Sequence, residues 1–423
     1  MLTLKQLRDD KEAAVRRLAK KGVDARPVID RIEQLDDRRK AIQQELDNCL
    51  SQQNQAAKMI GALMGQGKRD EAEAKKAEVA ALKEKSVKLS AEMKQTADAL
   101  QAEIVLLPNF PAEIVPEGTS AEDNLVVKLV ENYTPLPAEA LPHWELAKKY
   151  DIIDFDLGVK LTGAGFPVYK GKGARLQRAL INYFLDYNTR AGYQEVEPPV
   201  MVNEASGFGT GQLPDKEGQM YHATVDNFYL VPTAEVPVTN IFRDVILDEK
   251  DFPVKMTAYT PCFRREAGSY GKDVRGLNRL HQFDKVEIVR LSLPDDSYEA
   301  LDDMVAHVEG LVKSFGLPYR ILRLCGGDMS FTSALTYDFE VYSEAQKRWL
   351  EVSSVSNFES FQANRLKLRY RDANKKIHLA HTLNGSSLAL PRIVAALLEN
   401  NQTPEGIRIP EVLIPYTGFD IIK

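Results

Sequence analysis

The first quarter of the chain contains a long proline-free segment whose apolar residues recur at helical spacing. Between Pro27 and Leu107 there is no proline, and Ala, Glu, Lys, Gln and Leu predominate. Intervals of three, four or seven residues separate the apolar positions within two series: Val28, Ile32, Leu35, Ile42, Leu46 and Cys49, then Leu82, Leu89, Met93, Leu100 and Ile104. This spacing predicts two long amphipathic helices, each with a narrow apolar stripe.

Three glycines, Gly61, Gly65 and Gly67, lie between the two series and favour a reversal of the chain there. Two such helices folded back on each other bury both stripes. We therefore expect residues 1–107 to form an antiparallel α-helical coiled-coil hairpin that protrudes as an arm.

The composition and the predicted secondary structure of the chain change after this arm. Residues 108–124 are rich in proline and polar residues and are predicted to be a linker. In residues 125–423, strand-like apolar runs such as "FDKVEIVRL" and "TYDFEVYS" outnumber the helical stretches between them. This ratio predicts an α+β domain built on a mostly antiparallel sheet rather than a doubly wound parallel one.

Several classes of protein are disfavoured by the sequence. The sequence contains no run of about 18 apolar residues that would indicate a membrane span. The charged N-terminus does not resemble an export signal. The three cysteines, Cys49, Cys262 and Cys325, have no metal-binding or disulfide spacing, so we expect a cytoplasmic protein. Phosphate-loop, dinucleotide-binding, G-x-S-x-G and H-E-x-x-H motifs are missing from the sequence.

Residues 261–283, "PCFRREAGSYGKDVRGLNRLHQF", concentrate cations in a chain whose formal charge is -6. The cations are Arg264, Arg265, Lys272, Arg275 and Arg279. Two strands joined by a glycine-rich turn would bring arginines together, and guanidinium groups bind phosphate bidentately. Alternation places Arg264 and Glu266 on one face; Glu266 would accept hydrogen bonds from a base amine, and Phe283 would lie under a purine ring. A solvated, charged hairpin is the alternative interpretation.

The order "FRRE", loop, "RLHQF" resembles motif 2 of class II aminoacyl-tRNA synthetases, and the full run is similar to the seryl-tRNA synthetase family. Residues 178–202 resemble motif 1, which builds the dimer interface in that family. "HTLNGSSLALPRIVAALLENNQ" resembles motif 3, ending on Arg392, and "LEVSSVSNFESFQANR" resembles a nucleotide-binding strand. The N-terminal hairpin resembles the arm with which the family binds tRNA.

The resemblance implies an ATP site. Arg264 would bind the α-phosphate and the substrate carboxylate, while Arg279 and Arg392 would hold the outer phosphates. Catalysis would rest on Arg264 and Arg392, and Mg²⁺ would be bound by Glu351 and Ser354. The implied ATP-binding set is Arg264, Arg265, Glu266, Arg279, Phe283, Glu351, Val352, Ser353, Ser354 and Arg392. Taken alone, Ser353 and Ser354 also fit ordinary hydroxyls on a half-buried strand.

The resemblance also implies a serine pocket formed by Thr233, Ala234, Glu235, Arg264, Glu287 and Ser386. Two carboxylates at one site usually suggest acid–base chemistry, but here they would bind the substrate ammonium and accept from its hydroxyl. Such a pocket rejects alanine because an unpaired buried acceptor is costly. The alternative for Glu235 and Glu287 is structural pairing with a nearby arginine.

The implied activity is ATP-dependent attachment of serine to tRNA(Ser), and to tRNA(Sec) where present, through a seryl-adenylate. The implied enzyme is a homodimer that binds tRNA across its two subunits, with Lys272 and Arg275 near the acceptor end. Lysines 75, 76, 83, 85 and 88 of the arm would contact RNA phosphates, although a solvated charged face is the alternative. Two alternative interpretations are open. The chain could be a paralogue that forms an aminoacyl-adenylate but transfers the amino acid to a protein or other carrier, or it could be an RNA-binding protein without catalytic activity.

Three positions depart from the family pattern. Gly165 stands where an arginine is common, so the role of that arginine cannot be carried over. Ser387 and Pro391 stand in motif 3 where glycine is expected, and Pro391 directly precedes Arg392. Proline suits a first helical turn, but it also puts the geometry at Arg392 in question.

Overall fold

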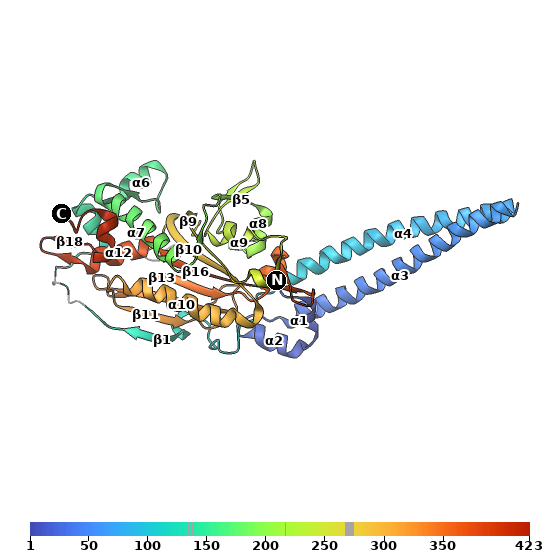
Figure 1. Cartoon of the computed structure of the whole chain (residues 1–423), viewed down its shortest axis with the longest axis horizontal. Helices are drawn as coiled ribbons and strands as arrows, with labels where there is room; N and C mark the ends of the chain where they lie inside the picture. The colour runs from blue at the N-terminus through green and yellow to red at the C-terminus, as the bar shows by residue number, and fades with distance from the viewer. Residues whose placement is uncertain (134–135, 137–138, 216, 267–274) are drawn as a thin grey trace. The chain divides into compact units, whose positions relative to one another are not determined.

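The computed structural model describes residues 1–133, 136, 139–215, 217–266 and 275–423, and the predicted loop residue Lys272 falls outside these ranges. Contacts divide the chain into two compact units (Figure 1). The first contains Met1–Ala19 and Val23–Pro108, and the second contains Lys20–Gly22 and Asn109–Lys423.

The first unit is dominated by the predicted helical hairpin (Figure 1), formed by α3 (Arg26–Gly65) and α4 (Arg69–Ile104). Two short helices, α1 (Leu4–Arg8) and α2 (Lys11–Ala19), precede it. Pro27 lies in the first turn of α3, where its missing N–H costs nothing. Gly67 follows α3 with a left-handed φ of 74° that favours glycine. The chain therefore reverses at the glycine cluster, as predicted from the sequence.

The predicted seam between α3 and α4 is confirmed, with one addition. Ile42, Cys49 and Leu89 are buried in it, and further predicted apolar positions pack around them. Asp36 is also buried, at 1% exposure, and its carboxylate contacts three cations: Arg8 at 2.5 Å, Arg39 at 2.8 Å and Lys40 at 2.7 Å. The three cations compensate for the burial of this carboxylate. The spacing of apolar residues does not predict it, because Asp36 is not apolar.

Within the described part of the second unit, an eight-stranded sheet has the order β1-β11-β12-β13-β16-β10-β9-β4. Neighbouring strands are antiparallel except β4 and β9, so the predicted mostly antiparallel sheet is confirmed. The strands are β1 (Leu125–Val130), β4 (Gln194–Glu195), β9 (Val254–Phe263), β10 (Gln282–Ser292), β11 (Tyr319–Arg323), β12 (Leu335–Ser343), β13 (Arg348–Asn357) and β16 (His381–Ala389).

Three helices pack on one face of this sheet: α7 (Gly171–Arg190), α10 (Ser297–Lys313) and α12 (Leu390–Asn400). They share the main hydrophobic core with Val286 and Ile288 of β10. Alternate residues of β10 point the other way, toward α9 (Glu235–Asn240) and α11 (Phe361–Leu366), where Val289 and Leu291 are buried. Glu287, which lies between Val286 and Ile288 in the strand, therefore points to the face opposite the main core.

Smaller elements surround the sheet. The short helices are α5 (His143–Lys149), α6 (Phe155–Leu161), α8 (Glu204–Thr210) and α13 (Ile414–Thr417). The short strands are β2 (Ile153–Asp154), β3 (Val168–Tyr169), β5 (Met201–Asn203), β6 (His222–Ala223), β7 (Phe228–Leu230), β8 (Ile246–Asp248), β14 (Arg369–Arg371), β15 (Ile377–Leu379), β17 (Gln402–Thr403), β18 (Gly406–Arg408) and β19 (Ile421–Ile422).

The segment predicted as a linker packs on the second unit from its first residues. The Asn109 amide donates to the carbonyl oxygens of Thr332 at 2.9 Å and Phe358 at 2.8 Å. The Ala112 N–H donates to the Ala334 carbonyl at 2.8 Å. Among the described residues, no helix has both the length and the apolar composition needed to cross a bilayer.

Candidate active site

Strand β9 ends at Phe263, and Arg264 follows it directly. Its N–H donates to the His281 carbonyl at 2.9 Å. Its guanidinium carbon lies 5.2 Å from the centre of the Phe283 ring. The predicted pair of a phosphate-binding arginine and a base-stacking aromatic therefore lies together at the end of the β9–β10 hairpin.

Glu266 reaches the site differently from the strand alternation that predicted it. It lies beyond the end of β9 and has a left-handed φ of 50°. Its Oε2 accepts a hydrogen bond from Arg279 Nη1 at 3.0 Å. The predicted adenine reader and the predicted phosphate binder are thus paired with each other.

Arg265 points toward a neighbouring segment. Its N–H donates to the Gln219 carbonyl at 2.8 Å, and its guanidinium lies 5.8 Å from the centre of the Tyr221 ring. Asp215 shapes that segment by accepting hydrogen bonds from the backbone N–H groups of Gln219 at 3.0 Å and Met220 at 2.8 Å.

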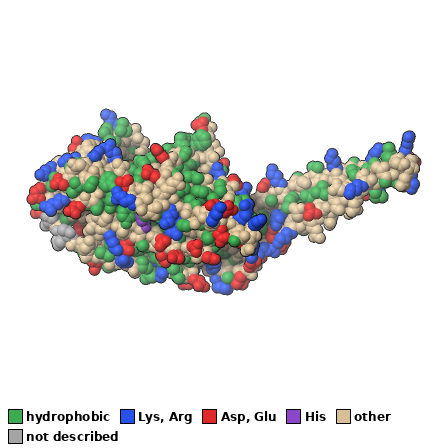
Figure 2. All heavy atoms as spheres, viewed as in Figure 1, with side chains coloured by type: hydrophobic (Ala, Val, Ile, Leu, Met, Phe, Trp, Pro, Cys, Tyr) green, Lys and Arg blue, Asp and Glu red, His purple; other side chains and the backbone are tan. Residues whose placement is uncertain are grey.

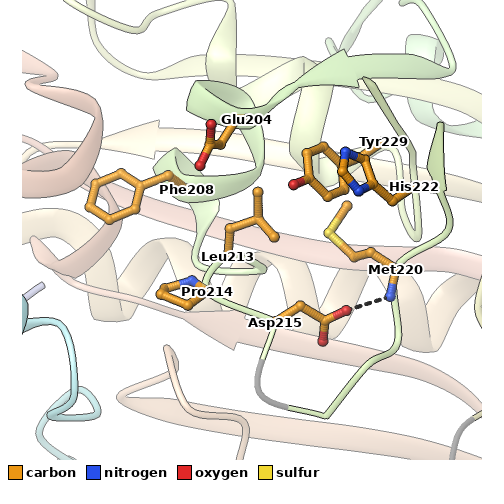
Figure 3. Close-up of a pocket in the computed structure, with 8 residues that line it drawn as sticks. All are labelled: Glu204, Phe208, Leu213, Pro214, Asp215, Met220, His222 and Tyr229. Atoms are coloured by element: carbon orange, nitrogen blue, oxygen red, sulfur yellow. Dashed lines mark hydrogen bonds between the residues drawn. The ribbon is translucent and has the colours of Figure 1, made fainter. Parts of the chain in front are cut away.

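A pocket of about 400 Å³ lies beside this segment (Figure 3). It is lined by Glu204, Phe208, Leu213, Pro214, Asp215, Met220, His222 and Tyr229. In the part of the chain that the structure describes, none of the predicted ATP or serine ligands lines this pocket. The predicted ATP and serine ligands therefore lie outside this pocket.

Glu287 lies in the middle of the sheet, on β10 between β9 and β16. In the strand register it is opposite Ala258 of β9 and Ser386 of β16. Its Oε1 accepts from Asn384 Nδ2 at 2.8 Å, and Lys285 Nζ lies 2.7 Å from its Oε2. Glu287, Lys285 and Asn384 are all buried, so the carboxylate is held in a fixed place.

The Thr233–Glu235 segment closes the other side of the predicted serine pocket. Arg264 Nε donates to the Pro232 carbonyl at 3.4 Å, and the Glu235 N–H donates to Thr233 Oγ1 at 3.2 Å. Glu235 begins α9 and is 7% exposed. Burial, together with the negative charge of Glu287, raises the pKa of Glu235 to about 7.

Sequence reasoning did not find three polar residues of this pocket: Lys285, Asn384 and Gln362. Gln362 Nε2 donates to Glu235 Oε1 at 2.6 Å. A signal for Lys285 was available, because it is two residues from Glu287 and alternation places both on one strand face. Asn384 and Gln362 reach the pocket only through tertiary contacts.

The predicted magnesium ligands lie on β13. The Glu351 side chain is 48% exposed, and Ser354 is opposite Asp338 of β12 in the strand register. Asp338 Oδ1 is buried without a hydrogen-bond partner, and burial with the charge of Glu351 raises the pKa of Asp338. Carboxylate and hydroxyl oxygens are ligands that Mg²⁺ prefers, so these residues fit the ion.

Two intervening residues of β13 are turned away from that position. Val352 is buried in the main core, so only its backbone can face a ligand. Ser353 donates from Oγ to the Ser386 carbonyl at 2.6 Å and is buried. In this structure the Ser353 hydroxyl therefore joins β13 to β16.

Arg392 lies in the first turns of α12, directly after Pro391, which occupies the position where proline suits a helix. Its Nη1 donates to the Glu351 carbonyl at 2.8 Å and lies 3.4 Å from Glu351 Oε2. The arginine predicted to hold the outer phosphates is thus beside the carboxylate predicted to hold Mg²⁺.

The other two departures from the family pattern also have local explanations. Gly165 has a φ of 85°, and a Cβ there would lie 2.5 Å from His281 Cδ2, so this backbone excludes a side chain. Ser387 is buried, and its hydroxyl donates to Asn188 Oδ1 of α7 at 2.8 Å. Ser387 therefore ties the sheet to the helix beneath it.

Of the predicted RNA-contacting lysines on the hairpin, Lys75 is half-buried and the other four are exposed. Lys75, Lys76, Lys85 and Lys88 pair with glutamates at distances of 2.6–2.8 Å. Figure 2 shows lysine and arginine side chains scattered along the visible face of the hairpin. Exposed pairs of this kind are weak, so the lysines can exchange their glutamates for phosphates.

The antiparallel sheet, with its arginine-bearing hairpin and helix α12, defines a class II aminoacyl-tRNA synthetase. A family model described as tRNA synthetase class II core domain (G, H, P, S and T) matches residues 220–401. A second model, Seryl-tRNA synthetase N-terminal domain, matches residues 1–111.

Full-length relatives give the particular family. A serine–tRNA ligase of Salinibacter ruber is 52% identical over 99% of this chain and 98% of its own length. The one from Nautilia profundicola is 47% identical over 98% and 100%. The seryl-tRNA synthetase of Pyrococcus horikoshii, solved with ATP, superposes with a TM-score of 0.92 at 31% identity, covering 100% and 99% of the two chains. The chain belongs to the seryl-tRNA synthetase family, and it is a ligase that attaches serine to tRNA.

Proposed function

We propose that the chain activates serine as seryl-adenylate before transferring it to tRNA(Ser), and to tRNA(Sec) where present. The observation that carries this proposal is the pair of buried carboxylates, Glu235 and Glu287, beside Arg264 on one face of the sheet. Two buried carboxylates suit an ammonium group, and Arg264 suits the carboxylate of the same amino acid. Ser386, opposite Glu287, lines the space for a short polar side chain.

In the first step, a serine carboxylate oxygen attacks the α-phosphorus of ATP, forming an O–P bond while the bond to the leaving pyrophosphate breaks. Arg264 orients the carboxylate and the α-phosphate, and Phe283 supports the adenine. Arg279 and Arg392 neutralise the departing phosphates. Catalysis then consists of positioning and charge stabilisation, without a side-chain nucleophile.

Mg²⁺, held by Glu351 and Ser354, would neutralise phosphate charge when bound. In the second step, a terminal ribose hydroxyl of tRNA attacks the activated carbonyl, and AMP leaves. The Pyrococcus horikoshii relative solved with ATP supports the nucleotide part of the proposal. A complex of A. aeolicus tRNASec with M. kandleri SerRS shares the fold, at a TM-score of 0.58 and 16% identity.

The proposal includes a homodimer that binds tRNA across its two subunits and works in the cytoplasm. The three cysteines, Cys49, Cys262 and Cys325, are free and buried, which suits a reducing compartment.

The test is ATP–pyrophosphate exchange with each of the twenty amino acids in the presence of Mg²⁺. We expect exchange with serine far above that with alanine or threonine. Folded protein that binds ATP but shows no serine-dependent exchange would contradict adenylate formation. Charging of a protein carrier instead of tRNA would support the paralogue interpretation.

A further inference from the structure

Gln362 of α11 makes three hydrogen bonds beneath the serine pocket and is only 1% exposed. Its Nε2 donates to Glu235 Oε1 at 2.6 Å and to the Thr210 carbonyl at 3.1 Å. Its Oε1 accepts from Thr382 Oγ1 at 2.6 Å. Both ends of the amide are therefore engaged, and three separate segments of the chain meet on it.

These partners fix which way the amide points. The backbone carbonyl of Thr210 can only accept a hydrogen bond, so the NH₂ group of Gln362 must face it. The same NH₂ group then faces Glu235 and presents it with a donor. A donor stabilises the carboxylate form of Glu235 over the protonated form.

We propose that Gln362 is a positioning residue of the serine pocket, which keeps the Glu235 carboxylate ionised and aimed at the substrate ammonium. This inference rests on the proposed role of Glu235 in binding serine. Gln362 lies behind Glu235 and acts on the amino acid only through that carboxylate.

The groups around Glu235 act in opposite directions. Burial and the negative charge of Glu287 raise the pKa of Glu235 to about 7, while Gln362, Lys285 and Arg264 lower it. Removal of the Gln362 donor raises this pKa further. More of the enzyme then carries protonated Glu235 at neutral pH, so serine binds less well, and raising the pH restores binding.

The test is the Gln362→Met variant, which keeps the side-chain length but removes the donor. Serine KM and kcat are measured by ATP–pyrophosphate exchange between pH 6 and 8.5. We expect serine KM to rise about fivefold at pH 7 and nearly tenfold at pH 6, the effect of raising the pKa of Glu235 by about one unit from about 7, with kcat changed less than about twofold. The increase in serine KM should shrink toward pH 8.5, because Glu235 is mostly ionised there even when its pKa is raised.

Gln177→Met is the matched control. Gln177 is also buried, and its Nε2 donates to Asp284 Oδ2 at 2.8 Å. Alternation along β10 points Asp284 away from the face that carries Glu287. This control removes an equivalent amide–carboxylate bond and should leave the pH dependence of serine KM unchanged.

A KM increase that is equal at every pH, or a matching loss of kcat, would overturn the inference. If Gln362→Met does not fold, Thr382→Val tests the same contact. It removes the hydrogen bond that anchors Gln362 Oε1, so the amide is held less firmly against Glu235 and serine KM should rise about threefold in the same pH-dependent way. An unchanged KM in that variant would equally count against the inference.

The Glu235→Gln variant distinguishes the proposed role of Glu235 in binding serine from the proposed role of Gln362 in positioning Glu235. Unchanged serine KM in Glu235→Gln would refute the proposed role of Glu235 itself. Weakened binding in Glu235→Gln, with normal behaviour of Gln362→Met, would refute only the role of Gln362.

Discussion

Arg264 occupies the point where the two halves of the proposed reaction meet. It lies over Phe283 on one side and contacts the Pro232 carbonyl, at the edge of the serine pocket, on the other. A single guanidinium can therefore contact the phosphate and the carboxylate that react. This position follows from the end of β9 and cannot be taken by a neighbouring arginine.

Arg264→Gln should reduce kcat/KM in serine-dependent exchange by about 10²–10³-fold, because it removes a charge aimed at the reacting groups. Arg320→Gln is the control, since Arg320 lies on β11 and pairs with Glu340. Steady-state exchange kinetics for the two variants make the comparison. Equal losses would mean that the effect is structural rather than catalytic.

Glu287→Gln should cost stability as well as serine binding. Lys285 and Glu287 are 6% and 1% exposed, so the substitution leaves a buried ammonium without its counter-charge. Removing one partner of a buried pair costs about 3 kcal/mol. Urea unfolding measures this difference, and the double variant Lys285→Met/Glu287→Leu should recover most of it.

At the scale of elements, the sheet explains why the site could be predicted only in part. Alternation on β10 is a local property, so Lys285 and Glu287 could be placed on one face from the sequence. Gln362 is 127 residues from Glu235, and Asn384 is 97 residues from Glu287. A local sequence pattern cannot predict contacts between residues that are about 100 positions apart in the chain.

The hairpin shows the same division. Its apolar seam follows from a seven-residue rhythm within each helix, and the structure confirms it. The buried Asp36 depends on Arg8, which is 28 residues away on α1. A periodic apolar pattern cannot anticipate a charge that another element neutralises.

The arm lysines carry a prediction about RNA. Replacing Lys75, Lys76, Lys83, Lys85 and Lys88 with glutamine should raise KM for tRNA at least about tenfold and make it less sensitive to salt, because fewer counterions are released. Serine-dependent exchange without tRNA should not change. Aminoacylation measured at several KCl concentrations tests this, and an unaltered salt dependence would favour the solvated-face interpretation.

At the scale of the whole molecule, cross-subunit tRNA binding can be tested by mixing two defective chains. One carries the five lysine substitutions, and the other carries Arg264→Gln. If the arm of one subunit delivers tRNA to the site of its partner, the mixed dimer has one intact combination and should regain aminoacylation. Binding within a single subunit predicts no recovery. Sedimentation should first show a mass of twice the 47.4 kDa chain.

The contacts of Arg392 with Glu351, and of Arg279 with Glu266, have a consequence for how ATP enters. Arg279 and Arg392, which would bind the outer phosphates, each already neutralise an acid that would bind the adenine or the metal ion. Binding therefore exchanges partners, and few mobile ions are released from the site. ATP affinity should vary little with ionic strength, while tRNA affinity falls steeply, so rising salt would uncouple activation of serine from its delivery.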